Sequence, residues 1–216
     1  MDARPQVVIF DVNETLTDME PLRARFEEVG LSGEQMTAWF ASVLRDGFAL
    51  TAAGGYAEFA QIATDVLKAL GLEDKAIGHV LSGFAELRVH PDVPAGMRAL
   101  REAGIRLFTM TNGAAAMTQG ILRREGLLDL VEATLDVSGP RVWKPAGAAY
   151  EYAVAQAGVD PGQAALVAVH PWDIDGAQRA GLIGAYLDRR GTAYPSVMST
   201  PHVSAPDLRA LAERWT

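Results

Sequence analysis

A carboxylate at residue 11 is the first group in this chain with clear chemical potential. Asp11 follows the apolar run 7–10 and begins the segment DVNET, so that Thr15 lies four residues after it. A carboxylate held by the backbone N–H groups of a tight turn, with a hydroxyl nearby, stays ionised and can act as a nucleophile. An aspartate that only caps a turn or a helix occurs at the same kind of position. This segment alone leaves both interpretations open.

A second polar segment follows the apolar run 105–110. Thr111, Asn112 and Gly113 together offer a hydroxyl, an amide and exposed backbone N–H groups at the start of the next expected helix. Such donors suit an anion, although a plain turn uses the same residue types. The segment is therefore a candidate anion site.

Two later segments add charged and ionisable side chains. A lysine close to two acids supplies a fixed positive charge, and Lys144 is either such a group or a surface lysine. Residues 167–177 read VAVHPWDIDGA, in which an apolar run gives way to His170, Asp173 and Asp175. His170 is either a base with a useful pKa or a hydrogen-bonded structural residue. Asp175 is expected to be a first-turn acid favoured by the helix dipole.

The elements that must position these residues alternate between strands and helices. The expected strands are 7–10, 105–110, 133–136, 165–169 and 184–187, and the expected helices between them are 93–103, 115–126, 146–158 and 173–181. This alternation is typical of βαβ units in a parallel sheet. The tail over 189–206 is rich in turn formers and is expected to be a loop before a last short helix.

The region from about 17 to 88 does not follow this alternation. It contains no convincing strand and four amphipathic patterns, around 20–29, 33–46, 55–70 and 73–86. We interpret it as an all-helical insertion beside the carboxyl end of the first strand, where open α/β sheets bind their ligands. Asp11 is therefore expected at the ligand-binding edge of the sheet, under a lid.

The composition narrows the class of partner. The chain has 216 residues, of which 49% are hydrophobic, and this is enough to bury a sizeable core as one or two domains. A net charge of −8 without a Lys/Arg-rich run argues against nucleic acid or an anionic membrane surface. No cysteine is present, which excludes disulfides, thiolate nucleophiles and zinc–thiolate sites. Without a secretory signal or an apolar run of roughly 18 residues, we expect a cytoplasmic protein that acts on a small molecule.

Taken in order, the motifs around Asp11, Thr111, Lys144 and Asp173 resemble those of the haloacid dehalogenase superfamily. Its members place a nucleophilic Asp after strand one, a Ser or Thr after strand two, a Lys before a later helix and acids after strand four. The resemblance implies a Rossmann-like α/β core domain formed by residues 1–16 and 88–216. It also implies an inserted all-helical cap domain formed by residues 17–87.

Within the superfamily, the chain is similar to the metal-independent 2-haloacid dehalogenases. Phosphatases of the superfamily read Asp-x-Asp-x-Thr, whereas the second acid position here is Asn13. Their metal-binding Asp lies four residues before the position of Asp173, where Val169 offers no ligand for Mg²⁺. The pair Trp172-Asp173 is typical of the dehalogenases and absent from the phosphatase pattern. The resemblance therefore implies neither a metal ion nor a cofactor.

The resemblance implies hydrolytic dehalogenation of a small 2-haloalkanoic acid through a covalent ester on Asp11. Lys144 would keep Asp11 ionised, and Thr15 would hold the oxygen that does not attack. Asp173, with His170, would position and deprotonate the water that cleaves the ester. The expected substrate contacts are Thr111 and Asn112, which would take the substrate carboxylate, together with Asn13, Phe40, Tyr150 and Trp172.

Two departures from the dehalogenase pattern keep alternatives open. Phe40 stands where the characterised enzymes carry an Arg that faces the substrate carboxylate, and His170 stands where they carry Asn. Loss of a bidentate cation should lower the affinity for a carboxylate. One alternative is a Mg²⁺-dependent phosphate-ester hydrolase, with the ion held by Asp11, a backbone carbonyl and Asp173 or Asp175. Another is a vestigial member that binds an acidic ligand. The resemblance also suggests a homodimer formed through cap helices.

Overall fold

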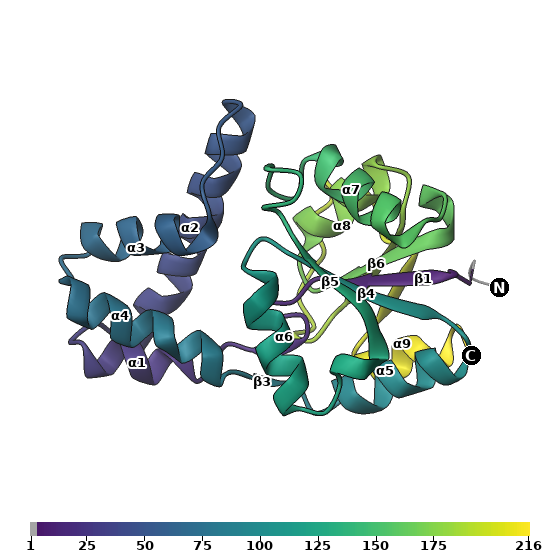
Figure 1. Ribbon diagram of the computed structural model, residues 1–216, viewed down its shortest axis with the longest axis horizontal. Helices are drawn as coiled ribbons and strands as arrows, with labels where there is room; N and C mark the ends of the chain where they lie inside the picture. Colours follow the sequence, from purple (N-terminus) through teal and green to yellow (C-terminus); the bar gives the residue numbers. More distant parts are fainter. Residues whose placement is uncertain (1–3) are drawn as a thin grey trace.

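A parallel sheet with helices on both faces forms one part of the molecule, and four helices form the other (Figure 1). The computed structural model describes residues 4–216. Its main sheet has six strands in the order β5-β4-β1-β6-β7-β8, and every pair of neighbours is parallel. The strands are β1 (Val7–Phe10), β4 (Arg106–Thr111), β5 (Val131–Asp136), β6 (Ala164–Ala168), β7 (Ile183–Leu187) and β8 (Val203–Ala205). Asp11 thus follows an inner strand, between the ends of β4 and β6.

The strands are apolar on both faces because helices cover both faces. Val7 and Ile9 of β1 belong to the core on one side, and Val8 and Phe10 belong to the core on the other. The covering helices are α5 (Val93–Glu102) and α9 (Leu208–Glu213) on one face, α7 (Gly147–Ala157) and α8 (Pro171–Arg179) on the other, and α6 (Ala115–Arg124), which contributes to both cores. This arrangement explains the continuous apolar runs in the sequence and confirms the predicted α/β fold class.

The remaining helices lie between β1 and β4 in the chain. They are α1 (Leu22–Glu28), α2 (Gly33–Ala52), α3 (Phe59–Ala69) and α4 (Asp74–Ser82), followed by the 3-10 turn η1 (Gly83–Glu86). Aromatic rings form their common core, with Trp39 5.4 Å from Phe26 and 6.0 Å from Phe84 between ring centroids. The chain leaves and re-enters the sheet part through two short antiparallel strands, β2 (Thr17–Asp18) and β3 (Arg88–Val89).

Several element boundaries differ from the predicted ones, and the short strands that were not predicted include β2 (Thr17–Asp18), in the region expected to be all-helical, and the edge strand β8. Helix α2 runs six residues beyond its predicted end at 46, and α8 begins two residues before its predicted start at 173. The prediction of a loop over 189–206 is wrong in part, because β8 pairs with β7 inside it. Val203 and Ala205 are buried while Ser204 is exposed. Such an alternation of only three residues among turn formers is too short to read from the sequence. Among residues 4–216, no helix has both the length and the apolar character needed to cross a membrane.

One aromatic side chain joins the helical part to the sheet part. The indole Nε1 of Trp143 donates to the carbonyl of Ala57 at 2.9 Å, and its backbone N–H donates to Thr51 Oγ1 at 3.1 Å. The ring of Phe59 stacks on the indole with centroids 6.1 Å apart. Gly47 of α2 packs so closely on this ring that an added Cβ would overlap it. Trp143 is fully buried and directly precedes Lys144, so these contacts reach the edge of the sheet where Asp11 lies.

Substitution of Gly47 tests this packing. The methyl group of Gly47→Ala would push α2 away from Trp143, and we expect a loss of about 1–3 kcal/mol in the free energy of unfolding. Urea unfolding measures this value. The control is Gly120→Ala in α6, where no atom lies within 4 Å of the added methyl group. That change should stabilise the protein by about 0.5–1 kcal/mol. Equal effects at the two glycines would contradict the close contact.

Candidate active site

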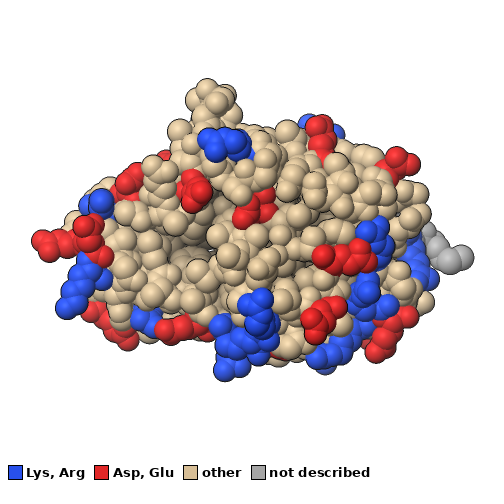
Figure 2. All heavy atoms as spheres, in the orientation of Figure 1, with Lys and Arg blue, Asp and Glu red and all other residues tan. Residues whose placement is uncertain are grey.

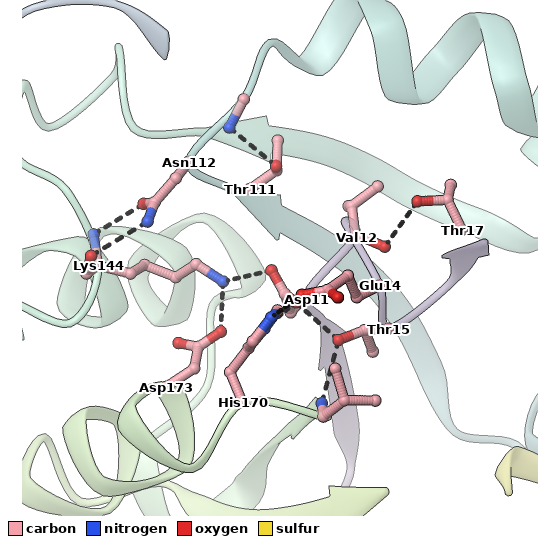
Figure 3. A network of polar contacts seen from close by, with 12 residues as sticks. Asp11, Val12, Glu14, Thr15, Thr17, Thr111, Asn112, Lys144, His170 and Asp173 are labelled. Atoms are coloured by element: carbon pink, nitrogen blue, oxygen red, sulfur yellow. Dashed lines mark hydrogen bonds and ion pairs between the residues drawn. The ribbon is translucent and has the colours of Figure 1, made fainter. Parts of the chain in front are cut away.

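Asp11 lies at the centre of a buried network of charged groups (Figure 3). Lys144 Nζ donates to Asp11 Oδ1 at 3.0 Å. The other carboxylate oxygen, Oδ2, accepts from Thr15 Oγ1 at 2.6 Å and lies 3.1 Å from His170 Nδ1. Oδ1 therefore has one side-chain partner and Oδ2 has two. This asymmetry favours Oδ1 as the oxygen that attacks a substrate.

The turn after β1 determines where Thr15 lies. The backbone N–H groups of Leu16 and Thr17 both donate to the carbonyl of Val12, which folds the chain back beneath Asp11. The Thr15 hydroxyl then donates to Asp11 and accepts from the backbone N–H of Val169, at the end of β6, at 3.1 Å. Thr15 thus links the ends of two neighbouring strands and fixes the orientation of the Asp11 carboxylate.

Lys144 connects Asp11 to a second buried carboxylate. Its side chain is fully buried, and Nζ donates to Asp173 Oδ2 at 2.6 Å. The other oxygen of Asp173 accepts from the Tyr150 hydroxyl at 2.6 Å. The predicted proximity of Asp11, Lys144 and Asp173 is confirmed. Tyr150 was expected to contact substrate, but its hydroxyl binds Asp173 instead.

The backbone of Lys144 is held by Asn112. The Asn112 amide donates to the Lys144 carbonyl at 3.1 Å and accepts from the Lys144 N–H at 2.9 Å. This reciprocal pair fixes the side chain against the Lys144 backbone and leaves one amide N–H of Asn112, which also lines the cavity described below. Thr111 Oγ1 accepts from the Gly113 N–H at 2.9 Å, which leaves the Thr111 hydroxyl proton available to a ligand.

Burial and charge act in opposite directions on these groups. Burial alone would raise the pKa of Asp11, but Lys144 and His170 outweigh it and lower that pKa. Burial would lower the pKa of Lys144, but Asp11 and Asp173 raise it, so Lys144 stays an ammonium group. Burial raises the pKa of Asp173 more than Lys144 lowers it. Asp11 is therefore the more readily ionised of the two carboxylates, and Asp173 is the one with the greater affinity for a proton.

His170 lies between two carboxylates. Its Nε2 is 2.9 Å from Glu14 Oε2, and its Nδ1 faces Asp11. Burial alone would lower the pKa of His170, but the hydrogen bonds to Asp11 and Glu14 raise it to about 9. An imidazolium cannot take a proton from water, so the predicted base role of His170 does not fit this site. Glu14 was not identified as a site residue from the sequence, because an acid in a turn is usually solvated. Its position directly before Thr15, in the same turn, was the feature that could have indicated it.

Three further predicted contacts lie in different surroundings. The Trp172 ring stacks on the His170 ring with centroids 5.1 Å apart and meets Phe48 of α2 edge-on at 5.0 Å, so it forms an apolar wall near Asp11. Phe40 is buried among Trp39 and Phe59 in the helical part. The structure thus shows Phe40 packed among aromatic rings of the helical part. Asn13 lines the cavity described next.

A cavity of about 240 Å³ lies where the two parts of the molecule meet, and Figure 2 shows a hollow in this region. Its lining includes Asn13 after β1, Thr111 and Asn112 at the end of β4, and apolar side chains such as Phe59 and Met117. Glu58 and Asp136 line it as well, and no Lys, Arg or His occurs among the described lining residues. The cavity therefore has the size for a small ligand, and its wall carries negative charge.

The donor set does not fit a magnesium ion. Within residues 4–216, no cluster of three or more His, Asp or Glu side chains could hold a metal. Both oxygens of Asp11 face cationic donors, and Lys144 also donates to an oxygen of Asp173. Asp175, the other candidate ligand, accepts from Arg179 and Ser199, and these bonds lower its pKa to about 2. Lys144 and His170 supply the positive charge that a divalent ion would otherwise provide.

Comparisons with known proteins agree with this geometry. Residues 5–181 match the family described as haloacid dehalogenase-like hydrolase. The (S)-2-haloacid dehalogenase of Pseudomonas sp. (strain YL) is 25% identical, over 95% of this chain and 92% of the relative. The (S)-2-haloacid dehalogenase 4A of Burkholderia cepacia is 28% identical, over 96% and 92%. A crystal structure of an L-2-haloacid dehalogenase superposes with a TM-score of 0.92 at 26% identity, covering 99% of both chains.

Removal of the Lys144 charge tests the electrostatic account. In Lys144→Met the buried Asp173 loses its cation while Asp11 keeps His170, and we expect a loss of about 3–5 kcal/mol at pH 8. The folded-state pKa of Asp173 in the variant should lie above its unfolded value, so its contribution to stability is retained at low pH and lost as the pH rises. The deficit relative to the wild type should therefore shrink at pH 5. Urea unfolding at both pH values measures it. Lys75→Met on the surface is the control and should change stability by at most about 0.5 kcal/mol.

Proposed function

Because the chain belongs to the haloacid dehalogenase-like hydrolase family, we propose that it hydrolyses the carbon–halogen bond of a small 2-haloalkanoic acid through an ester on Asp11. The observation that carries the proposal is the buried ammonium of Lys144 between Asp11 and Asp173. It provides an ionised carboxylate nucleophile without a metal-binding donor set. The names of the (S)-2-haloacid dehalogenases matched over nearly the whole chain support the same substrate class.

In the first step Asp11 Oδ1 attacks the carbon that bears the halogen, from the side opposite to it. The new C–O bond forms as the C–X bond breaks, and the halide leaves with the bonding electron pair. Lys144 orients Oδ1, while Thr15 holds Oδ2 away from the substrate. The apolar rings of Trp172 and Phe48 limit hydration of the carboxylate, which strengthens it as a nucleophile.

In the second step water adds to the carboxyl carbon of the Asp11 ester. Asp173 takes a proton from this water, because its raised pKa makes it the better base of the two buried acids. The ester bond then breaks at the carboxyl carbon, and Asp173 returns the proton to the departing alkoxide. The products are a 2-hydroxy acid and a regenerated Asp11 that carries an oxygen atom from water.

We also propose that residues 17–87 act as a cap domain over a core domain formed by residues 1–16 and 88–216. The contacts of Trp143 with Thr51, Ala57 and Phe59 support this role, because they connect the cap helices to the residue before Lys144. The cytoplasmic location and the homodimer expected from the resemblance remain predictions.

The substrate carboxylate has no arginine partner in this proposal. Phe40 packs among aromatic rings of the cap. The neutral side-chain donors at the cavity include the Thr111 hydroxyl and the amides of Asn13 and Asn112, and Glu58 and Asp136 line it as well. We infer that a small haloacid binds weakly here, since neutral donors contribute less than a bidentate cation and the two acids repel an anion.

Neutralisation of Glu58 should therefore improve substrate binding. Glu58 precedes α3 and makes no side-chain cap hydrogen bond, so Glu58→Gln removes charge without removing a contact of that kind. We expect KM for L-2-chloropropionate to fall about two- to fivefold with little change in kcat, and this effect to shrink in high salt. Glu73→Gln, at the corresponding position before α4, is the control and should leave KM unchanged. An unchanged KM in Glu58→Gln would show that the substrate does not bind in this cavity.

Chloride release from L-2-chloropropionate is the direct test of the function. The wild type should release chloride without added metal, and Asp11→Asn should not, because an amide cannot form the ester. A single turnover in heavy-oxygen water should place the label in the Asp11 carboxylate, which mass spectrometry of the peptide detects.

Other outcomes of the same assay would overturn the proposal. Magnesium-dependent release of phosphate from an aryl phosphate, without dehalogenation, would favour the phosphate-ester hydrolase. No turnover over a broad panel of haloacids and phosphate esters would favour a vestigial member that binds an acidic ligand.

A further inference from the structure

The turn after β1 contains a residue in an uncommon backbone conformation. Glu14 has φ of 63°, in the left-handed region that favours glycine. A residue with a side chain adopts this conformation at a cost of roughly 1–2 kcal/mol, which other contacts must offset. Here the Glu14 carboxylate contacts two cationic side chains, His170 at 2.9 Å and Arg190 at 2.9 Å. The strained turn therefore delivers an acid to His170.

His170 is fixed on three sides. Nε2 faces Glu14, Nδ1 faces Asp11 Oδ2, and the ring lies nearly parallel to that of Trp172, with an angle of 26° between the planes. Only 13% of the side chain is exposed. The imidazole therefore cannot turn away from Asp11 without breaking both ion pairs.

The charges around His170 keep it protonated. Two carboxylates contact the ring directly, while the cations Lys144 and Arg190 contact those carboxylates from their far sides, and Asp173 lies beyond Lys144. Although burial opposes the charge, the two direct contacts raise the pKa of His170 to about 9. Both ring nitrogens are then N–H donors at neutral pH.

We propose that His170 is a catalytic residue of the ester-hydrolysis step, in which it and Thr15 form an oxyanion hole around Oδ2 of Asp11, and that Glu14 is the residue that positions it. The inference rests on the proposed function, because it requires an ester on Asp11. Its basis is the pair of donors already aimed at one oxygen, with the Thr15 hydroxyl at 2.6 Å and His170 Nδ1 at 3.1 Å.

The chemistry of the step accounts for both donors. In the ester, Oδ1 carries the substrate carbon and Oδ2 is the carbonyl oxygen. When water adds to the carboxyl carbon and gives a proton to Asp173, the C=O electron pair moves to Oδ2, which becomes the oxyanion. The Cγ–Oδ1 bond breaks as this pair returns, and the alkoxide takes the proton from Asp173. The regenerated Asp11 carboxyl loses its remaining proton to solvent. Donors preorganised at a developing oxyanion stabilise the transition state without rearrangement.

Glu14 has a separate purpose in this scheme. Ester formation neutralises Asp11 and removes one of the two carboxylates that hold the proton on His170. The charge of Glu14 is unaffected by the reaction, so His170 remains an imidazolium when the oxyanion forms. If Asp11 were the single carboxylate partner of His170, formation of the ester would lower the pKa of His170. The imidazolium would then lose its proton just when the oxyanion forms.

Single-turnover kinetics test the role of His170. The wild type and His170→Phe, which keeps a ring but has no N–H donor, are mixed with L-2-chloropropionate; chloride release reports ester formation, and mass spectrometry of the Asp11 peptide reports the ester. We expect His170→Phe to hydrolyse the ester about 10²–10³-fold more slowly while ester formation changes far less, so the ester accumulates. His79 and Glu28 form a similar ion pair away from Asp11, and His79→Phe and Glu28→Gln are the matched controls.

Glu14→Gln provides a second test that does not depend on the folding of His170→Phe. Loss of the Glu14 charge should lower the pKa of His170, so the hydrolysis step should lose activity at a lower pH than in the wild type, with a downward shift of about one unit or more. Nitrogen NMR of the His170 ring, which requires no substrate, should show the same shift.

The outcomes separate the inference from the function on which it rests. Ester accumulation in His170→Phe together with the shift in Glu14→Gln supports the inference. Chloride release with unchanged ester hydrolysis in both variants, or a His170 ring that titrates near 6.5 regardless of Glu14, overturns the inference alone. A wild type that releases no chloride from haloacids overturns the proposed function and the inference together.

Discussion

The ion pairs of Lys144 with Asp11 and Asp173 are the interaction on which the rest of the site depends. Removing three charged groups from water costs several kcal/mol per ion unless each finds a partner with good geometry. The surrounding structure meets this requirement with neutral contacts, since Asn112 holds the Lys144 backbone and Tyr150 binds the second oxygen of Asp173. The polar residues at the ends of three strands are therefore parts of one arrangement that keeps a single ammonium group fixed.

The site handles its negative charge with fixed side-chain cations. Lys144 and His170 face three carboxylates, those of Asp11, Asp173 and Glu14. This distribution keeps Asp11 ionised and leaves Asp173 with a raised affinity for protons. The difference between the two acids follows from their surroundings and not from their residue type, as expected when burial and neighbouring charges compete. One buried cluster thus contains two aspartates with opposite pKa shifts.

The sequence predicted the fold and the central charges because these depend on strong, local patterns. Apolar runs flanked by helices predicted the parallel strands, and their ends brought Asp11, Thr15, Lys144 and Asp173 together. The directions in which side chains point could be predicted less well from the sequence. Asn112 binds a backbone 32 residues away, and Glu14 reaches His170 because of an unusual φ angle. Neither contact has a periodic signature. Phe40 could be matched to a position in the family pattern, but the direction of its side chain could not be predicted. An apolar residue on a helix suits either a cavity wall or an aromatic core.

The attachment of Trp143 has a mechanical consequence. The indole and the backbone of this residue are bonded to Ala57 and Thr51 in the helical part, and the next peptide unit carries Lys144. A hinge motion that separates the helices from the sheet must either break these bonds or pull on the segment that holds the ammonium group. Access for a ligand and assembly of the charged cluster are therefore coupled, because the position of the Lys144 ammonium depends on the helices lying against the sheet.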